Sequence, residues 1–307
     1  MTESILFTGI SGALGQLITH KLHNKVHIIG IDKRPFSAKP ANVELHDLDL
    51  RRKSAIQLLS KKKIDCIIHI GVIRGDRPRR ENSAASYFNL ETTTQVLRLA
   101  EQLGVRKFIF LSSSYLYGPS GHTAGFLSED SPLHGAASIP DQGDLVALDI
   151  MVQSFFWKQP NIETVILRPV HIVGPHLNNA PTRYLKLKTV PTLLGYDPII
   201  QVVHETDTVR AFELALKPSV RGIFNIVGAE QAPLSRIIEA RGARALPLPE
   251  ILFRKFIRAA FRRGLTTYRP GEIDHLKYTC LVDGSHATKE LSFKPNKTLM
   301  QSLHDLG

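Results

Sequence analysis

The most constraining feature of the sequence is a short apolar run that is followed at once by three regularly spaced glycines. The run at residues 5–7 predicts a buried parallel strand, because both faces of such a strand are covered by helices. Gly9, Gly12 and Gly15 follow it, and apolar residues recur at helical spacing from Leu14 onward. The sequence therefore predicts a strand, a tight turn and a helix in direct succession.

A turn of this kind is suited to an anionic ligand. Gly9 lets the chain turn sharply, Gly12 removes a side chain where a phosphate would approach, and Gly15 lets helix and strand pack closely. The free N–H groups of the first helical turn then face the anion. A plain strand-to-helix turn without a ligand is the simpler alternative. If the turn binds a dinucleotide, the residues expected at the cofactor are Gly9, Ser11, Gly12, Ala13, Leu14 and Gly15.

A second predicted strand, residues 26–31, supports dinucleotide binding because it ends in an acid. Asp32 lies about 20 residues after the glycines, where a carboxylate would bind the ribose hydroxyls. Such a carboxylate favours NAD, because it repels the 2′-phosphate of NADP. Lys33 and Arg34 come next and could offset that repulsion, so NADP stays possible and Lys33 is an expected cofactor contact.

Two more strand ends are expected at the cofactor. Residues 43–50 predict a third strand, in which Asp49 would accept from the adenine amino group with Leu50 beside it; Asp47 or a solvated loop acid are the alternatives. Residues 64–70 predict the next strand, which brings Ile70 and Gly71 to the edge where parallel strands meet ligands. The loop that follows is basic and could clamp pyrophosphate, although a solvated charge run is the commoner explanation; it contains Arg74, Arg77, Arg79 and Arg80.

The rest of the first half alternates between predicted helices (89–103 and 145–157) and predicted strands (108–111 and 164–167). This alternation predicts an α/β fold with a Rossmann-type doubly wound parallel sheet. Residues 118–144 are rich in Gly, Pro and Ser and are predicted as a loop or lid over the site. We expect an NAD(P)-binding domain at residues 1–170 and a smaller α/β substrate lobe at residues 171–307, with some segments returning to the main sheet.

Composition narrows the class of protein without selecting a partner. The net charge of +11 favours anionic small-molecule ligands. No apolar run approaches the ~20 residues of a membrane span, and the N-terminus lacks a secretory signal, so a cytoplasmic location is expected. The two cysteines make no disulfide framework, and no metal site is predicted.

Residues 252–263 predict a basic amphipathic helix. Its apolar face would hold Leu252, Phe253, Phe256, Ile257, Ala260 and Phe261. Its basic face would hold Arg254, Lys255, Arg258 and Arg262. Such a helix can lie on an anionic membrane, but the favoured interpretation is that it covers its own core. We therefore predict no firm membrane or nucleic-acid partner.

Taken in order along nearly the whole chain, the motifs resemble the extended short-chain dehydrogenase/reductase superfamily, in its NAD-dependent epimerase/dehydratase branch. They are Thr8-Gly9-x-x-Gly12-x-x-Gly15, Asp32, Asn89, Ser112-Ser113-Ser114-x-x-Tyr117-Gly118, Leu167-Arg168-Pro169, Val203-His204-x-x-Asp207 and Asn225-Ile226-Val227-Gly228. The resemblance implies that NAD(P) is also contacted by Asn89, Arg168 and Pro169. It further implies a nucleotide-sugar or related substrate that is oxidised and then reduced in place, and a possible homodimer formed through a helix pair.

One departure from the family pattern bears directly on catalysis. The family places a tyrosine and a lysine four residues apart on the helix after the serine-rich strand end, and the lysine lowers the tyrosine pKa. If Asp149 is aligned with the family's helix glutamate, Asp141 falls at the tyrosine position and Leu145 at the lysine position. The family's hydroxyl partner falls at Ser113, four residues before Tyr117.

Two hypotheses follow from this departure. In the first, the protein is an active epimerase/dehydratase-type enzyme that keeps Ser113 and uses a displaced acid/base group. The candidate groups are Tyr115, Tyr117, His122, Asp141 and His204. In the alternative, it is a catalytically inactive NAD(P)-binding sensor or regulatory protein. The pattern Tyr184-x-x-x-Lys188 lies in the second lobe and is not expected to reach the nicotinamide.

Overall fold

A computed structural model describes residues 3–71, 80–121, 125–138, 143–264, 266 and 270–307. Its centre is a sheet of seven parallel strands in the order β11-β7-β5-β4-β1-β2-β3. The strands are β1 (Ser4–Thr8), β2 (His27–Ile31), β3 (Val43–His46), β4 (Cys66–His69), β5 (Lys107–Leu111), β7 (Glu163–Pro169) and β11 (Gly222–Ile226). This is the Rossmann-type sheet that the sequence predicts, and its strand order reverses between β1 and β4.

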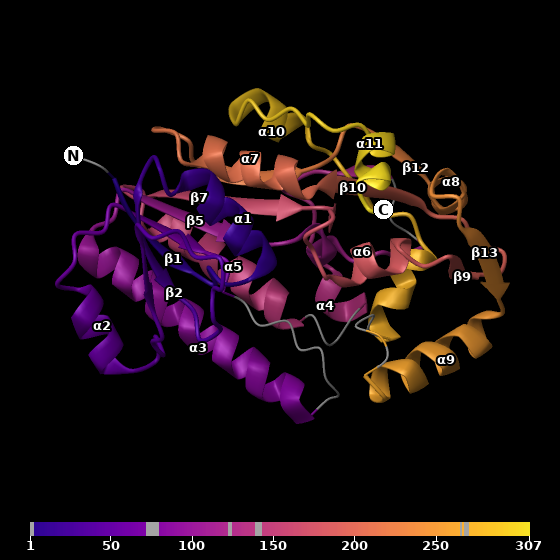
Figure 1. The fold of residues 1–307 in the computed structure, drawn as a ribbon, viewed down its shortest axis with the longest axis horizontal. Coiled ribbons are helices and arrows are strands. Elements are labelled where there is room, and N and C mark those ends of the chain that lie inside the picture. Colours follow the sequence, from indigo (N-terminus) through magenta and orange to yellow (C-terminus); the bar gives the residue numbers. More distant parts are fainter. Residues whose placement is uncertain (1–2, 72–79, 122–124, 139–142, 265, 267–269) are drawn as a thin grey trace.

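Helices cover both faces of the sheet. One face packs against α1 (Ala13–Leu22), α7 (Glu205–Ala215) and α10 (Ser285–Glu290). The other packs against α2 (Lys53–Leu59), α3 (Arg80–Leu103) and α5 (Gly143–Lys158). In Figure 1, α7 and α10 lie above the strands, and α2 and α3 lie below them. The sequence of β1 is apolar throughout because its side chains face both cores: Ile5 and Phe7 belong to the core cluster on one face of the sheet, and Leu6 to the cluster on the other.

The second half of the chain forms smaller sheets around a third core cluster. Its strands are β8 (His171–Val173), β10 (Ile199–His204) and β12 (Gln231–Pro233), with β9 (Thr189–Leu193) paired to β13 (Arg244–Leu248). Its helices are α6 (Ala180–Leu185), α8 (Leu234–Ala240), α9 (Glu250–Arg262) and α11 (Leu299–His304), with a 3₁₀ segment η3 at Pro270–Leu276. Strand β11 returns to the main sheet beside β7, as expected, while the division at residue 170 stays a prediction.

Three segments differ from the sequence-based prediction. Helix α3 begins at Arg80 and not at residue 89, so Arg80 of the predicted basic loop lies on this helix, while Arg74, Arg77 and Arg79 lie outside the described residues. The third strand ends at His46 and not at residue 50, because the Asp49 carboxylate accepts a hydrogen bond from the Arg51 N–H at 3.1 Å and turns the chain toward α2. The predicted loop at residues 118–144 contains regular structure within its described part. It holds β6 (Phe126–Leu127), which pairs with β14 (Leu281–Val282), and α4 (Gly135–Ser138).

Across the described ranges, no helix is both long enough and apolar enough to cross a lipid bilayer.

A buried histidine stands where β4 leaves the sheet. His69 is fully buried, with Nδ1 2.6 Å from Thr8 Oγ1 and Nε2 2.9 Å from Thr93 Oγ1. Burial lowers the pKa of His69 from 6.5 to about 4, because an imidazolium loses its hydration there. The neutral ring therefore bridges β1 and α3 at neutral pH.

This shift predicts a loss of stability below neutral pH. The unfolded chain takes up this proton first as the pH falls, so the stabilisation fades between about pH 6.5 and pH 4. His69 alone is expected to lower the free energy of unfolding by about 2 kcal/mol between pH 7 and pH 5. Urea titrations at the two pH values measure this change. Between pH 7 and pH 5, the free energy of unfolding of His69→Gln should fall by about 2 kcal/mol less than that of the wild type. Equal pH dependence of both proteins would contradict the prediction.

Candidate functional site: a glycine turn and a histidine-lined pocket

The glycine turn is closely packed against the end of β4. Gly9 has a φ of +78°, and a Cβ there would lie 2.6 Å from Gly71 Cα. A Cβ on Gly15 would lie 2.6 Å from the Gly9 carbonyl oxygen. These glycines are therefore required by the fold itself. Helix α1 then starts at Ala13 without a side-chain cap, so its first N–H groups have no intrahelical partner.

The turn has features that fit an anionic group. Ser11 Oγ is buried and finds no hydrogen-bond partner within the described part of the chain. Asp32 accepts from the Ser11 N–H at 3.0 Å and from Arg34 Nη2 at 3.0 Å. The Arg34 guanidinium lies over Gly12, 3.3 Å from where a Cβ would stand. An unpaired hydroxyl, free helix N–H groups and a guanidinium thus belong to this turn or lie over it, and groups of this kind suit a pyrophosphate.

The predicted adenine contact is already occupied by basic side chains. Asp49 accepts from Arg51 Nε at 2.9 Å and Nη2 at 2.7 Å, and Lys33 Nζ lies 3.4 Å away. These hydrogen bonds hold the pKa of Asp49 well below its usual range. Leu50 is buried beside it. The structure thus places Asp49 in an ion-pair cluster, and its role at the cofactor stays a prediction.

Arg168 and Tyr117 belong to a buried network. Arg168 bonds Asp149 at 2.6 and 3.1 Å, and both side chains are fully buried. Arg168 Nη1 also donates to the Tyr117 hydroxyl at 2.9 Å, which in turn donates to Asn225 Oδ1 at 2.8 Å. Burial raises the pKa of Tyr117. This geometry favours a structural role for both residues, and Pro169 ends β7 directly after Arg168.

The other predicted site residues fall in different places. Ser113 is buried and accepts from the Tyr115 N–H at 3.3 Å, which starts the 3₁₀ turn η1 (Ser114–Tyr117). Asn89 is buried and donates to Asp144 at 3.2 Å. Leu145 packs against the core cluster under the sheet. His122 and Asp141 lie outside the described residues, and Ile70 precedes Gly71, which packs against Gly9.

Two further alternatives have structural partners. His204 accepts from the Thr206 N–H at 3.2 Å and caps α7, and burial lowers its pKa. The Tyr184 hydroxyl donates to the Pro191 carbonyl at 2.7 Å in the second lobe. In these contacts His204 is held at the start of α7 and Tyr184 against β9.

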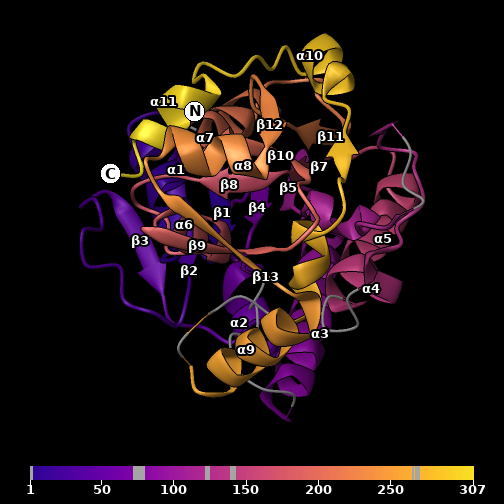
Figure 2. The ribbon, with the colours of Figure 1, turned by 90° about the vertical axis from the view of Figure 1, so that its right-hand side faces the viewer.

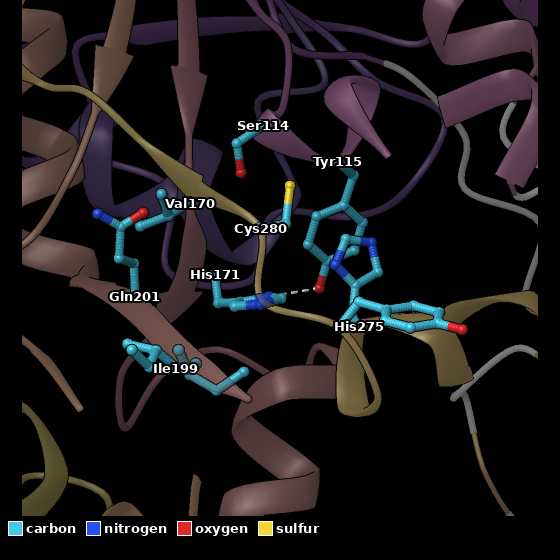
Figure 3. Close-up of a pocket in the computed structure, with 10 residues that line it drawn as sticks. Ser114, Tyr115, Val170, His171, Ile199, Gln201, His275 and Cys280 are labelled. Atoms are coloured by element: carbon cyan, nitrogen blue, oxygen red, sulfur yellow. Dashed lines mark hydrogen bonds between the residues drawn. The ribbon is translucent and has the colours of Figure 1, made fainter. Parts of the chain in front are cut away.

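A pocket between η1, β8 and η3 contains the remaining candidate, Tyr115 (Figure 3). Its hydroxyl and His171 Nδ1 share a hydrogen bond of 2.6 Å, and its ring lies 4.3 Å from that of His275. Burial lowers the pKa of His171 to about 4, and burial together with His171 lowers that of His275. The pocket is also lined by Ser114, Val170, Ile199, Ile200, Gln201, Tyr278 and Cys280.

Sequence reasoning named Tyr115 but missed both histidines. His171 could have been found, because it lies two residues after Pro169 at a strand end. His275 comes from a segment without periodic pattern, about 100 residues later, and only tertiary folding brings it to the pocket. Its Nε2 is buried and unpaired within the described ranges.

Comparison with known proteins identifies the class. The model of the NAD dependent epimerase/dehydratase family matches residues 5–226, and the chain belongs to this family.

Individual relatives extend this likeness over the whole chain. An uncharacterized protein of Mycobacterium tuberculosis is 25% identical over 98% of this chain and 82% of its own length. An uncharacterized UDP-glucose epimerase of Bacillus subtilis, YtcB, is 26% identical over 76% of this chain and 79% of its own. Among solved structures, MoeE5 in complex with UDP-glucose and NAD superposes with a TM-score of 0.76 at 19% identity, covering 99% of this chain and 97% of that one.

The unpaired hydroxyl in the turn gives a test of dinucleotide binding. Ser11→Ala removes a buried polar group without a partner, so the free energy of unfolding should stay the same or rise by about 1 kcal/mol. NAD affinity should fall by about tenfold, because a hydrogen bond to a charged phosphate is lost. Calorimetric titration and urea unfolding measure the two effects, with Ser154→Ala on α5 as the control. Unchanged affinity would place the pyrophosphate elsewhere.

Proposed function

We propose that the protein binds NAD and interconverts a hydroxyl and a carbonyl on a nucleotide-sugar substrate, with Tyr115 as the acid/base group. The observation that carries this proposal is the hydrogen bond between Tyr115 and His171 in the pocket. Tyr115 follows β5 and His171 follows β7, at the same carboxyl edge of the parallel sheet as Gly9 and Gly71. Ligands bind along this edge in doubly wound folds.

The cofactor-side residues fit a dinucleotide. Gly9, Gly12 and Gly15 would shape the pyrophosphate site, and Ser11 and the first turn of α1 would supply donors. Asp32 would bind the adenosine ribose and favours NAD over NADP. A bound NAD would supply the hydride acceptor for the substrate carbon. Solved relatives hold NAD, among them MoeE5, and this supports the choice.

Tyr115 and His171 can move the proton that accompanies oxidation of the substrate. As the substrate hydroxyl loses its proton to the Tyr115 oxygen, the phenolic proton passes to His171 Nδ1. Burial keeps the resting His171 neutral, so this nitrogen is available as an acceptor. The same burial disfavours the imidazolium, which returns the proton when the carbonyl is reduced again.

The substrate class rests on charge and on the relatives. The net charge of +11 favours an anionic ligand. MoeE5 binds UDP-glucose and UDP-glucuronic acid, and a human relative, 26% identical over 54% of this chain and 51% of its own, is named dTDP-D-glucose 4,6-dehydratase. Because the relatives with named activities are enzymes, a purely sensory role is not favoured. The sugar ring would lie against Ser114 and Tyr115 at the pocket.

A homodimer is also proposed, through α3 and α5. These two helices pack side by side under the sheet and expose large apolar side chains. Tyr87 on α3 is 67% exposed, and on α5 Ile150 is 50% and Trp157 75% exposed. Ile150 and Trp157 are seven residues apart and share one helix face. A second copy of the chain would remove this face from water.

Catalysis is tested by Tyr115→Phe. The purified protein should convert at least one of UDP-glucose, UDP-glucuronic acid and dTDP-glucose in the presence of NAD, as followed by chromatography. Tyr115→Phe should lower kcat by about 100-fold or more, because the proton relay is broken, while NAD affinity stays unchanged. Tyr117→Phe is the matched control: it should lower thermal stability without altering the pH dependence of kcat. NAD binding without turnover of any substrate would favour the sensor alternative.

The dimer is tested by light scattering. The wild-type protein should have twice the mass of the chain, and Ile150→Glu/Trp157→Glu should be monomeric, because four buried charges would face each other across the interface. Met300→Glu, on the distant α11, changes an equally exposed apolar side chain and should remain dimeric. A wild-type mass equal to one chain would contradict the proposal.

A further inference from the structure

Helix α9 lies at the edge of the molecule in both views (Figure 1 and Figure 2). One face is held firmly: Phe253, Ile257 and Phe261 are buried in the core cluster of the second lobe or next to it. Ion pairs anchor the first turns. Arg254 bonds Glu250 at 2.8 Å and Asp274 at 2.6 Å, the latter in η3. The helix therefore presents a defined opposite face to solvent.

That opposite face is more apolar than the sequence predicts. Leu252 and Phe256 were expected in the core, but the structure leaves them 56% and 58% exposed, and Ile251 is 71% exposed. The expectation was wrong because the core-facing stripe is narrow and takes only positions 253, 257, 260 and 261. Leu252 and Phe256 are four residues apart, so they form neighbouring points on the outer surface.

Basic side chains line the same outer surface. Lys255, Arg258, Arg262 and Arg263 are all exposed, and no ion pair joins them to a carboxylate of the described residues. Lys255, Arg258 and Arg262 follow each other at helical spacing and run beside the Leu252–Phe256 stripe. The outer face of α9 thus carries one apolar stripe and one cationic stripe, parallel to the helix axis.

We propose that this outer face of α9 docks the protein on an anionic phospholipid surface. Leu252 and Phe256 would enter the boundary between headgroups and acyl chains, and Lys255, Arg258 and Arg262 would contact the headgroup phosphates. The arrangement does not involve the pocket or the glycine turn, so it is independent of the proposed reaction. It would hold an enzyme of anionic sugar substrates at a membrane surface.

The chemistry of the face favours lipid over other anionic partners. A nucleic acid would be met by basic side chains with stacking rings or donors to base edges, and the aliphatic Ile251 and Leu252 offer neither. An acidic protein surface would neutralise the cations but does not require two segregated stripes along one helix. A lipid interface requires both at once, because it presents phosphates above hydrocarbon.

The experiment measures flotation of the full-length protein with vesicles of phosphatidylcholine alone or containing phosphatidylglycerol. The protein should float only with the anionic vesicles, and added salt should weaken binding. Leu252→Ser/Phe256→Ser should weaken it by at least tenfold. Lys255→Glu/Arg258→Glu/Arg262→Glu should weaken binding by about 100-fold, because each lost cation lowers the affinity on the order of five-fold.

Matched controls separate the face from overall charge and folding. Arg52→Glu/Lys53→Glu/Lys61→Glu, at α2, changes the net charge by the same amount on exposed residues elsewhere, and Met300→Ser removes an apolar side chain that is 57% exposed. Both should float almost as well as the wild type, and every variant should keep the wild-type circular dichroism spectrum. Equal loss in the α2 and α9 charge variants would reduce the effect to net charge and overturn the proposal.

Insertion is tested directly with a single tryptophan. The chain has one tryptophan, so Phe256→Trp in a Trp157→Phe background places the only indole on the outer face of α9. Anionic vesicles should shift its emission to the blue, and brominated acyl chains should quench it. No flotation, no quenching, or tighter binding of an acidic peptide or RNA than of vesicles would overturn membrane docking.

Discussion

The structure depends on a guanidinium that has no access to water. Arg168 is fully buried, and its charge is balanced by Asp149, which is equally buried and 2.6 Å away. Such a pair is stable only when every donor and acceptor is satisfied, and removal of one partner typically costs about 3–5 kcal/mol. Here Ser112 donates a hydrogen bond to Asp149, and Arg168 donates to the Tyr117 hydroxyl and to the Glu129 carbonyl. The network therefore joins β5, α5, β7 and the segment before α4.

This constraint explains the form of the pocket. Because the Tyr117 hydroxyl is committed to Arg168 and Asn225, the short 3₁₀ turn η1 is fixed at its far end. Ser113 fixes its near end by accepting from the Tyr115 N–H. Tyr115 lies between these two anchors, and its ring is directed into the pocket against His275. A structural tyrosine thus positions a second tyrosine that can take part in chemistry.

The sequence is most informative where one local rule decides the structure. Strands β1, β4, β5 and β7 are apolar on both faces, and the glycines at 9 and 15 leave no room for a Cβ. The sequence is less informative where the structure depends on the width of a buried helix face or on contacts between residues far apart in the chain. Periodicity located the apolar side of α9 but not how far the core extends around it, so Leu252 and Phe256 were placed wrongly. His275 reaches the pocket through packing that no spacing encodes.

The pocket differs from the glycine turn in its electrostatics, and the difference bears on how a substrate would lie. None of the described lining residues is a lysine, arginine or carboxylate, and burial keeps His171 and His275 neutral. A phosphate placed among these groups would lose its hydration without gaining a counter-charge. The Gln201 amide is already bonded at both ends to the Val282 backbone, so a neutral sugar hydroxyl would instead exchange its water for the Ser114 and Tyr115 hydroxyls. In the proposed nucleotide-sugar substrate, the uncharged sugar is therefore the part that would approach these groups, and the diphosphate would lie outside them.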